Sequence, residues 1–271
     1  MLGKLFKHEF IATGRYFLPL YIFVIILTPI FSLIMRISDF AEKENALGFT
    51  MMYGLSVTGF IIMMIAIFIG TTILIILRYY KTTATSEAYL TFTLPVKTYQ
   101  IILAKTLTAY IWEIVSGIIA FMSIFSMMLI TGVLKLSDIR DMVNFITTNF
   151  ASFTDYLSMG SMLLIIISIL LGGLQGILRI YFSISVGQLF RNHRVLISIA
   201  AYFALYTILQ VIGSVFMLPM LFADTTALSD AAMTKFSMNY SFIFSSIESI
   251  AIIVLCFLGT TYINKKHLNV Q

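Results

Sequence analysis

Charged residues are scarce in this sequence. Asp, Glu, Lys and Arg make up 11% of the 271 residues, and hydrophobic residues make up 60%. Soluble domains average about 25% charged and about 45–50% apolar residues, so a soluble fold of this chain would expose large apolar patches. Cysteine occurs once, at Cys256, which excludes an intrachain disulfide. The composition therefore indicates an integral membrane protein.

The motifs of common enzymes are missing as well. The sequence has no G-x-x-x-x-G-K-[ST] phosphate-binding loop and no H-E-x-x-H zinc motif. Its three histidines, His8, His193 and His267, lie at the ends of apolar runs, so none is placed to activate a serine within the membrane. Asp is absent from the apolar runs, which argues against an intramembrane aspartyl protease. We predict that the chain is not an enzyme and has no metal or nucleotide site of its own.

Six apolar runs are long enough to span a bilayer, which takes roughly 20 residues. Each should be a helix, because lipid offers no partner for free backbone groups. The third and fourth runs exceed one crossing and should tilt or project beyond the bilayer. The first run is followed by no small-residue cleavage site, so we do not expect a signal peptide. We predict an all-α integral membrane protein with one transmembrane domain over residues 1–271 and spans at about 17–35, 51–77, 101–134, 157–190, 195–222 and 240–263.

The loops between these runs differ in charge, which predicts their orientation. Twelve of the 17 Lys and Arg residues fall on the side that holds both chain ends. We therefore expect a multi-pass protein of the cell membrane with both termini in the cytoplasm. The net charge of +5 then reflects membrane orientation and not nucleic-acid binding. The cytoplasmic group is Lys4, Lys7, Arg15, Arg78, Lys81, Lys97, Lys105, Arg179, Arg191, Arg194, Lys265 and Lys266.

Two segments outside the spans are predicted to form surface helices. In residues 1–15, Leu2, Leu5, Phe6 and Phe10 recur at helical spacing, which favours a helix lying in the membrane interface. The alternative is a basic flank that only sets topology. The longest hydrophilic loop, 135–156, contains DIRDMVNFITTNF, which is compatible with a short surface helix.

A few polar residues lie inside the apolar runs. Glu113 and Glu248 are ionisable, and such groups usually face a bundle interior or a water-filled path. Each is a candidate for a substrate path, and the alternative is a structural hydrogen bond. Gly172 and Gly176 form a G-x-x-x-G pair, which predicts close helix packing. Gln210 is expected to form a structural hydrogen bond.

The stretch between the second and third runs predicts a short helix over residues 85–94. Thr85 or Ser86 can cap its start, and Pro95 should end it. About two helical turns are not stable alone in water, so this helix needs a surface to lie on. Its side chains form two apolar stripes, which suit two different surfaces, although packing on its own bundle alone is the alternative. One stripe holds Tyr89 and Phe92 with Ser86, and the other holds Leu90 and Leu94.

These features together resemble the permease subunits of type-2 ABC transporters, in their small exporter-like class. The similarity lies in an interfacial N-terminal helix, six spans with both ends inside, and an acidic–small–hydrophobic turn that ends in Leu-Pro and a basic residue. The small residue is often Gly in that family and is Ala88 here. The second cytoplasmic loop, SISVGQLFRNHRVLISI, is also similar. The resemblance implies that residues 85–94 are a coupling helix, with ATPase-coupling residues Glu87, Ala88, Tyr89, Leu90, Phe92, Leu94, Pro95 and Lys97, and Gln188, Arg191 and Arg194 in the second loop.

The same resemblance implies partners. Such a permease dimerises, as a homodimer or a heterodimer, and pairs with two cytoplasmic ABC ATPase subunits that bind ATP and Mg. The expected function is export of a hydrophobic or amphipathic substrate out of the cell or the membrane, with antimicrobial and toxic peptides among the candidates. The alternative is a stand-alone secondary carrier that needs no ATPase. Carriers often have two related halves, and this sequence has no clear internal similarity.

Overall fold

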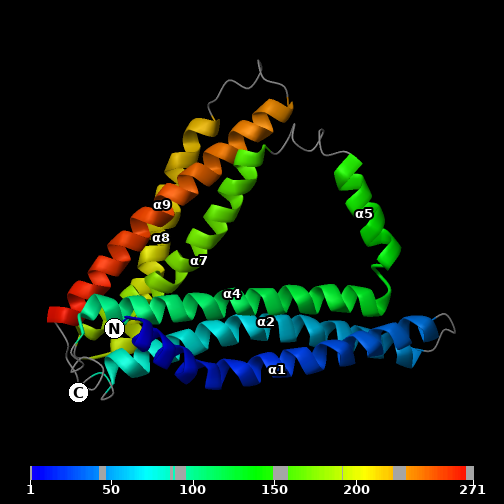
Figure 1. Ribbon diagram of the computed structural model, residues 1–271, viewed down its shortest axis with the longest axis horizontal. Coiled ribbons are helices and arrows are strands. Elements are labelled where there is room, and N and C mark those ends of the chain that lie inside the picture. Colours follow the sequence, from blue (N-terminus) through cyan, green and yellow to red (C-terminus); the bar gives the residue numbers. More distant parts are fainter. Residues whose placement is uncertain are drawn as a thin grey trace. The chain divides into compact units, whose positions relative to one another are not determined.

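The computed structural model describes residues 2–42, 47–85, 88, 96–148, 158–190, 192–221 and 230–266. Over these residues the chain is helical, with no strand. In chain order the helices are α1 (Leu2–Glu42), α2 (Leu47–Ala84), α4 (Thr98–Thr131), α5 (Leu136–Thr148), α7 (Met159–Gln188), α8 (Arg194–Leu221) and α9 (Asp230–Lys266) (Figure 1).

All these helices except α5 are long and apolar enough to cross a membrane. Each of the six overlaps most of one predicted span, and each is longer than the roughly 20 residues that a crossing needs. The helices α4, α7 and α8 end one to three residues inside the predicted bounds 101–134, 157–190 and 195–222. The predicted class, an all-helical chain with six apolar helices of spanning length, is confirmed. We conclude that the protein is a multi-pass membrane protein.

The N-terminal segment differs from its predicted form. We expected a helix over residues 1–15 that ends before the first span. Instead, α1 is one helix from Leu2 to Glu42 and continues through Pro19 and Pro29. Proline is tolerated in membrane helices because neighbouring groups can satisfy the freed carbonyls. Residues 2–15 are thus the first turns of the same helix that forms the span.

The helices group into two compact units. We call the first the α1–α4 unit; it comprises Phe6–Ile75 and Ile111–Thr147. We call the second the α7–α9 unit; it comprises Met1–Leu5, Ile76–Tyr110 and Thr148–Gln271. The second unit therefore includes the last turns of α2 and the first turns of α4.

Aromatic stacking joins α1 to α4 within the α1–α4 unit. Trp112, the only tryptophan of the chain, lies on α4 between two rings of α1. Its ring stacks on Phe10 at a centroid distance of 4.7 Å and on Phe17 at 4.9 Å. Its indole N–H donates to Thr13 Oγ1 at 2.8 Å. Because Phe10, Thr13 and Phe17 share one face of α1 by their spacing, a single side chain of α4 contacts two helical turns of α1.

Hydroxyl groups connect α1, α2 and α4 within the same unit. Tyr21 of α1 donates to the Trp112 carbonyl of α4 at 3.0 Å, and its hydroxyl lies 2.8 Å from Ser116 Oγ. Ser116 Oγ is also 2.7 Å from Thr71 Oγ1 of α2. A hydroxyl can both donate and accept, so these three side chains bond one another without a charge.

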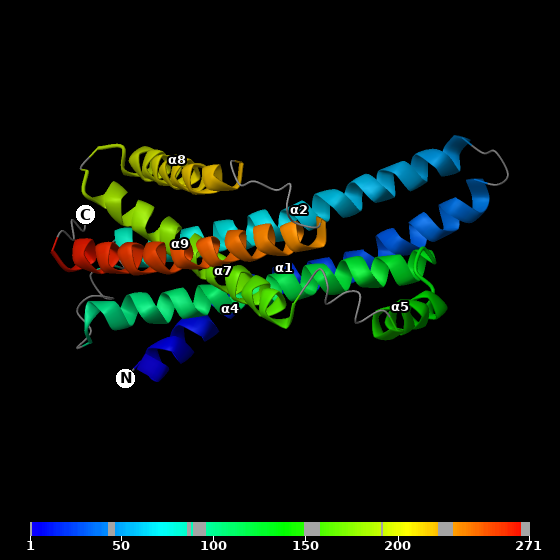
Figure 2. The same cartoon turned by 90° about the horizontal axis from the view of Figure 1, so that it is seen from above.

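A parallel seam joins α7 to α9, and both views draw these helices side by side (Figures 1 and 2). Bonded partners on the two helices stay 74 to 79 residues apart from one end of the seam to the other, which requires parallel helices. On α7 the bonded residues recur every seven positions, the repeat of left-handed helix packing. The pairs are Ser161–Asn239 at 2.7 Å, Ser168–Ser246 at 2.9 Å and Gln175–Ser249 at 2.9 Å.

Apolar packing continues the seam beyond the polar pairs. Leu178 of α7 packs with Ile252 and Cys256 of α9 in a buried cluster. Further along, the ring of Phe182 lies against Gly259, where a Cβ atom would overlap the ring. Gly259 is therefore needed for the close approach of α7 and α9 at this point.

The helix α5 follows α4 after a tight connection (Figure 2). Gly132, with φ 80°, lies just past the end of α4, and the Leu134 N–H bonds the Met128 carbonyl at 3.0 Å. The Lys135 N–H then donates to Asp138 Oδ2 at 3.0 Å. The surface helix that we considered within loop 135–156 is present as α5.

Candidate functional site

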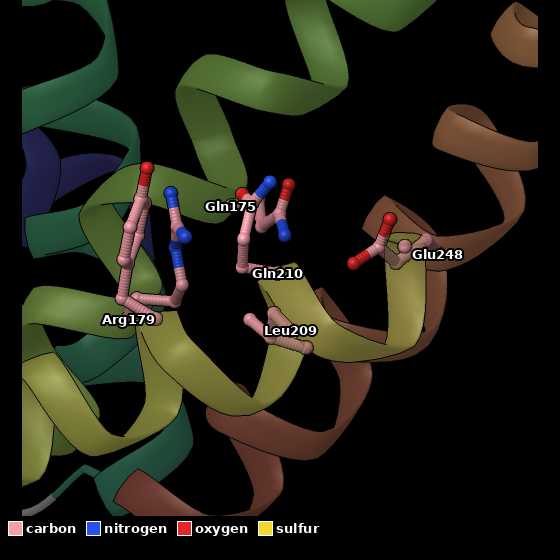
Figure 3. A pocket seen from close by; sticks show the side chains of 7 residues that line it. Gln175, Arg179, Leu209, Gln210 and Glu248 are labelled. Carbon is pink, nitrogen blue, oxygen red and sulfur yellow. The ribbon is translucent and has the colours of Figure 1, made fainter. Parts of the chain in front are cut away.

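The candidate site is a pocket among α7, α8 and α9. It has a volume of about 160 Å³. Figure 3 shows Gln175 and Gln210 next to each other, with Arg179 on one side of them and Glu248 on the other. The pocket is lined by Gln175 and Arg179 of α7, by Tyr206, Leu209, Gln210 and Gly213 of α8, and by Glu248 of α9.

The charged residues of this pocket lie well inside helices of spanning length. Arg179 is nine residues before the end of α7, which corresponds to about 13 Å along the helix. Glu248 is 18 residues before the end of α9 at Lys266, or about 27 Å. Ionisable groups at such positions are costly and usually serve a function.

The α7–α9 seam positions the polar groups from α7. Ser249 Oγ donates to Gln175 Oε1 at 2.9 Å, which fixes the amide and leaves its NH₂ group available to the pocket. Arg179 is half-buried, and its Nε atom is buried without a hydrogen-bond partner in the part of the chain that the structure describes. The pocket is thus lined by a guanidinium group that is not fully paired within the described residues.

Of the two predicted path residues, only Glu248 lines this pocket. Glu113 belongs to the α1–α4 unit and is half-buried on α4. Its Oε2 atom is buried and meets no hydrogen-bond partner among the described residues. Arg179 needs a correction, because we counted it among the loop charges and it lies within α7 beside the pocket.

A second group of polar residues lies where α2, α7 and α9 meet near their ends. We call it the Tyr79 cluster; it consists of Tyr79, Tyr181, Ser185 and Asn264, each at most 3% exposed. Asn264 Nδ2 donates to the Tyr79 hydroxyl at 3.1 Å and to Ser185 Oγ at 3.2 Å. The Tyr79 and Tyr181 rings stack with their centroids 3.8 Å apart. The cluster therefore ties three helices together by hydrogen bonds and one ring stack.

A further bond continues from this cluster toward the loops. Gln188, the last residue of α7, donates from Nε2 to Thr83 Oγ1 of α2 at 3.5 Å. Thr83 and Gln188 are both buried. This contact brings together the helix ends that lead into both predicted coupling loops.

The predicted coupling residues fall into two groups. Glu87, Tyr89, Leu90, Phe92, Leu94, Pro95 and Arg191 lie outside the described residues. Ala88 is fully buried, with its N–H bonded to the Thr85 carbonyl at 2.9 Å, and Lys97 is exposed just before α4. Arg194 opens α8 and donates from Nε to the Phe190 carbonyl at 3.3 Å. Gln188 is buried and bonds Thr83, so it connects the end of α7 to the end of α2 inside the protein.

The glycine pair of α7 has open space beside it. A Cβ atom at Gly172 or Gly176 would meet no heavy atom within 4 Å. Among the described residues nothing packs against this pair, so close helix packing at Gly172 and Gly176 stays a prediction. Gln210, expected to form a structural bond, is exposed and lines the pocket.

Sequence reasoning missed most of the site. Gln175 and Arg179 are one helical turn apart, and each interrupts an apolar stretch, so their i, i+4 spacing was the available signal. The Tyr79 cluster had no such signal, because Tyr, Ser and Asn near helix ends are common. Its members are distant in sequence, and only the packing brings them together.

Comparison with known proteins adds no identification: no family model, curated protein or solved structure matches this chain. Among the described residues, no group of three or more His, Cys, Asp or Glu side chains could hold a metal ion. The pocket offers charged and hydrogen-bonding groups to a ligand, and the Thr83–Gln188 bond links the ends of α2 and α7.

Proposed function

We propose that this protein is the permease subunit of an ATP-driven ABC exporter, with ATP hydrolysis supplied by separate cytoplasmic subunits. The polar pocket among α7, α8 and α9 supports a substrate site within the membrane-spanning region. The sequence contains no phosphate-binding loop, which fits a chain that relies on a partner for ATP and Mg.

The observation that carries this proposal is the Thr83–Gln188 contact beside the Tyr79 cluster. A coupling device must transmit a push on cytoplasmic loops to the helices that line the substrate site. Residues 85–94 follow directly after α2, and α2 is bonded through Tyr79 to Ser185 of α7 and Asn264 of α9. Both α7 and α9 line the pocket. Movement of the first loop would therefore move the pocket walls.

Membrane orientation and assembly form part of the same proposal. Both termini would be cytoplasmic, the first turns of α1 would lie at the cytoplasmic interface, and the membrane would be the cell membrane. The permease would act as a dimer with itself or with a second permease. These assignments rest on the distribution of Lys and Arg and on the resemblance described above.

One observation favours a second candidate function. Glu248 is a carboxyl group in a pocket within a helix of spanning length, as in many ion-coupled carriers. A stand-alone secondary carrier would use this group to bind a proton or cation and would need no ATPase.

The experiment uses the full chain, tagged and purified from its native membrane. We expect a cytoplasmic ATPase to co-purify with it. Tyr89→Ala combined with Phe92→Ala should insert normally but lower ATPase binding at least about tenfold, as expected for buried aromatic anchors of an interface. Tyr99→Ala is the matched control, because Tyr99 is an exposed tyrosine on α4 just beyond this segment.

Two results would overturn the proposal. One is substrate transport by the purified chain in proteoliposomes with an ion gradient and no ATPase, which would establish the carrier. The other is a double variant that keeps its full complement of ATPase and couples hydrolysis to transport as the wild type does.

A further inference from the structure

The pocket among α7, α8 and α9 carries both signs of charge. Arg179 supplies a guanidinium group, and Glu248 supplies a carboxyl group from another helix. Figure 3 shows the amides of Gln175 and Gln210 between them. The two charges thus lie on opposite sides of neutral hydrogen-bonding groups.

This arrangement discriminates between classes of ligand. A singly charged anion would gain from Arg179 and lose from Glu248, and a singly charged cation would do the reverse. An apolar ligand would leave the guanidinium, the carboxyl and two amides without partners in a low-dielectric setting, which is costly. A ligand with one anionic and one cationic group satisfies both sides at once.

The guanidinium group of Arg179 supports the anionic half of this argument. Its Nε atom is buried and has no partner within the described residues. The planar fork of a guanidinium group matches the oxygens of a phosphate or a carboxylate. The anionic group of the ligand should therefore lie at Arg179 and its cationic group at Glu248.

The surface of α8 beside the pocket suits an apolar tail. Ile199, Phe203, Tyr206, Gln210 and Gly213 follow one another at spacings of three and four residues, so they lie on one stripe of the helix. Ile199 and Phe203 are 53% and 61% exposed, which leaves apolar surface in line with the pocket. A head group in the pocket would place an attached chain along these side chains.

We propose that this pocket binds the zwitterionic head group of an amphiphile, with the phosphate or carboxylate at Arg179 and the ammonium group at Glu248. The assignment rests on the proposed function, since it names the class of substrate for the same site. The proposed ligand has a head group that carries both charges and is joined to an apolar chain.

The test compares ligands with the same C12 chain and different head groups. Native mass spectrometry of the full chain in dodecyl maltoside would measure displacement of this neutral detergent by dodecylphosphocholine, dodecyl phosphate and dodecyltrimethylammonium. We expect the zwitterion to bind at least about tenfold tighter than dodecyl phosphate, which carries only negative charge, or dodecyltrimethylammonium, which carries only positive charge. Free phosphocholine, which lacks the chain, should bind at least about tenfold more weakly than dodecylphosphocholine.

Variants separate this role from a structural ion pair. Arg179→Gln and Glu248→Gln should each weaken dodecylphosphocholine binding about tenfold, and the double variant should bind no better than either single variant. If the two residues serve only to neutralise each other, the double variant should bind like the wild type. Glu113→Gln is the matched control, because it removes a half-buried carboxyl group from the α1–α4 unit and should leave binding unchanged.

Three results would overturn the inference: equal binding of all four C12 head groups, wild-type binding by the double variant, or equal binding of phosphocholine with and without its chain. The last would point to a soluble zwitterion. The assay needs no ATPase, so its failure leaves the proposed coupling intact. Failure of the ATPase experiment would likewise leave a positive binding result standing.

Discussion

The two compact units hold their helices together with different chemical groups. In the α1–α4 unit the contacts are an aromatic stack around Trp112 and the hydroxyls of Tyr21, Ser116 and Thr71. In the α7–α9 unit the contacts include the amides of Gln175 and Asn264, and the pocket adds a guanidinium and a carboxyl group.

The difference lies in which chemical groups border a pocket. A hydroxyl donates once and accepts from a neighbour, so a chain of hydroxyls can satisfy itself. An amide or a charged side chain has more donors and acceptors than the facing helix has partners for them. Among the described residues, buried polar atoms without partners occur in both units: Asn264 Oδ1 and Arg179 Nε in the α7–α9 unit, and Glu113 Oε2 and Ser38 Oγ in the α1–α4 unit. Arg179 also lines the pocket among α7, α8 and α9, and we therefore place the proposed substrate site in the α7–α9 unit.

The largest effect should come from breaking the Tyr79 cluster. Asn264→Leu removes both donors to Tyr79 and Ser185, and we expect it to lower the free energy of unfolding by about 2 kcal/mol. Thermal unfolding of the purified chain in detergent would measure this. Lys265→Gln, at the exposed neighbouring position, should change stability by less than about 0.5 kcal/mol. Equal stability of the two variants would show that the cluster does not hold the helices together.

A somewhat smaller loss of stability is expected from alanine at Gly187 of α7, and no loss is expected from alanine at Gly176 of the same helix. A Cβ atom at Gly187 would overlap Ser198 Oγ and lie 2.6 Å from the Arg194 carbonyl oxygen, so Gly187→Ala should cost about 1–2 kcal/mol. At Gly176 there is open space, and alanine favours a helix more than glycine does. Gly176→Ala should therefore keep or raise the melting temperature. A melting temperature lowered equally by both variants would contradict the open space at Gly176.

The smallest effect comes from deleting one hydroxyl in each unit. Tyr79→Phe removes a partner of both Asn264 and Ser185, and we expect a loss of about 1 kcal/mol. Tyr21→Phe leaves Ser116 with its bond to Thr71, so its loss should be about 0.5 kcal/mol. Chemical denaturation of the two variants side by side would rank them. A larger loss for Tyr21→Phe would reverse the comparison between the units.

Much of the fold could be predicted because lipid leaves few alternatives. Apolar runs must be helices there, so their number and approximate positions followed from length and composition. The extent of α1 did not, because an amphipathic pattern such as that of Phe6 and Phe10 is the same whether a helix lies in the interface or continues into a span. The structure shows that α1 is continuous from Leu2 to Glu42 and that Phe10 stacks on Trp112 of α4, and the interfacial position of its first turns stays a prediction.

The site was harder to predict, and the reason is physical. Glu248 was visible because a carboxyl group inside an apolar run is unusual. Arg179 lies inside the predicted span 157–190 but was also counted among the loop charges, because a cation near the end of an apolar run is the usual sign of a loop. The helix α7 extends nine residues beyond it. Gln188 was predicted as an ATPase-coupling residue of the second loop; it is the last residue of α7 and is buried with a bond to Thr83. Pairings of this kind depend on helix rotation, which hydropathy does not encode.

The position of Cys256 has a practical consequence. The only thiol of the chain is buried between α7 and α9, against Leu178 and Ile252. Thiol reagents require an accessible sulfur, so the native chain should give almost no background with a water-soluble maleimide. Single cysteines can then be introduced without first replacing Cys256. At an exposed residue of α5 such as Asp141, the added cysteine would be modified by an impermeant reagent only from the side of the membrane that α5 faces.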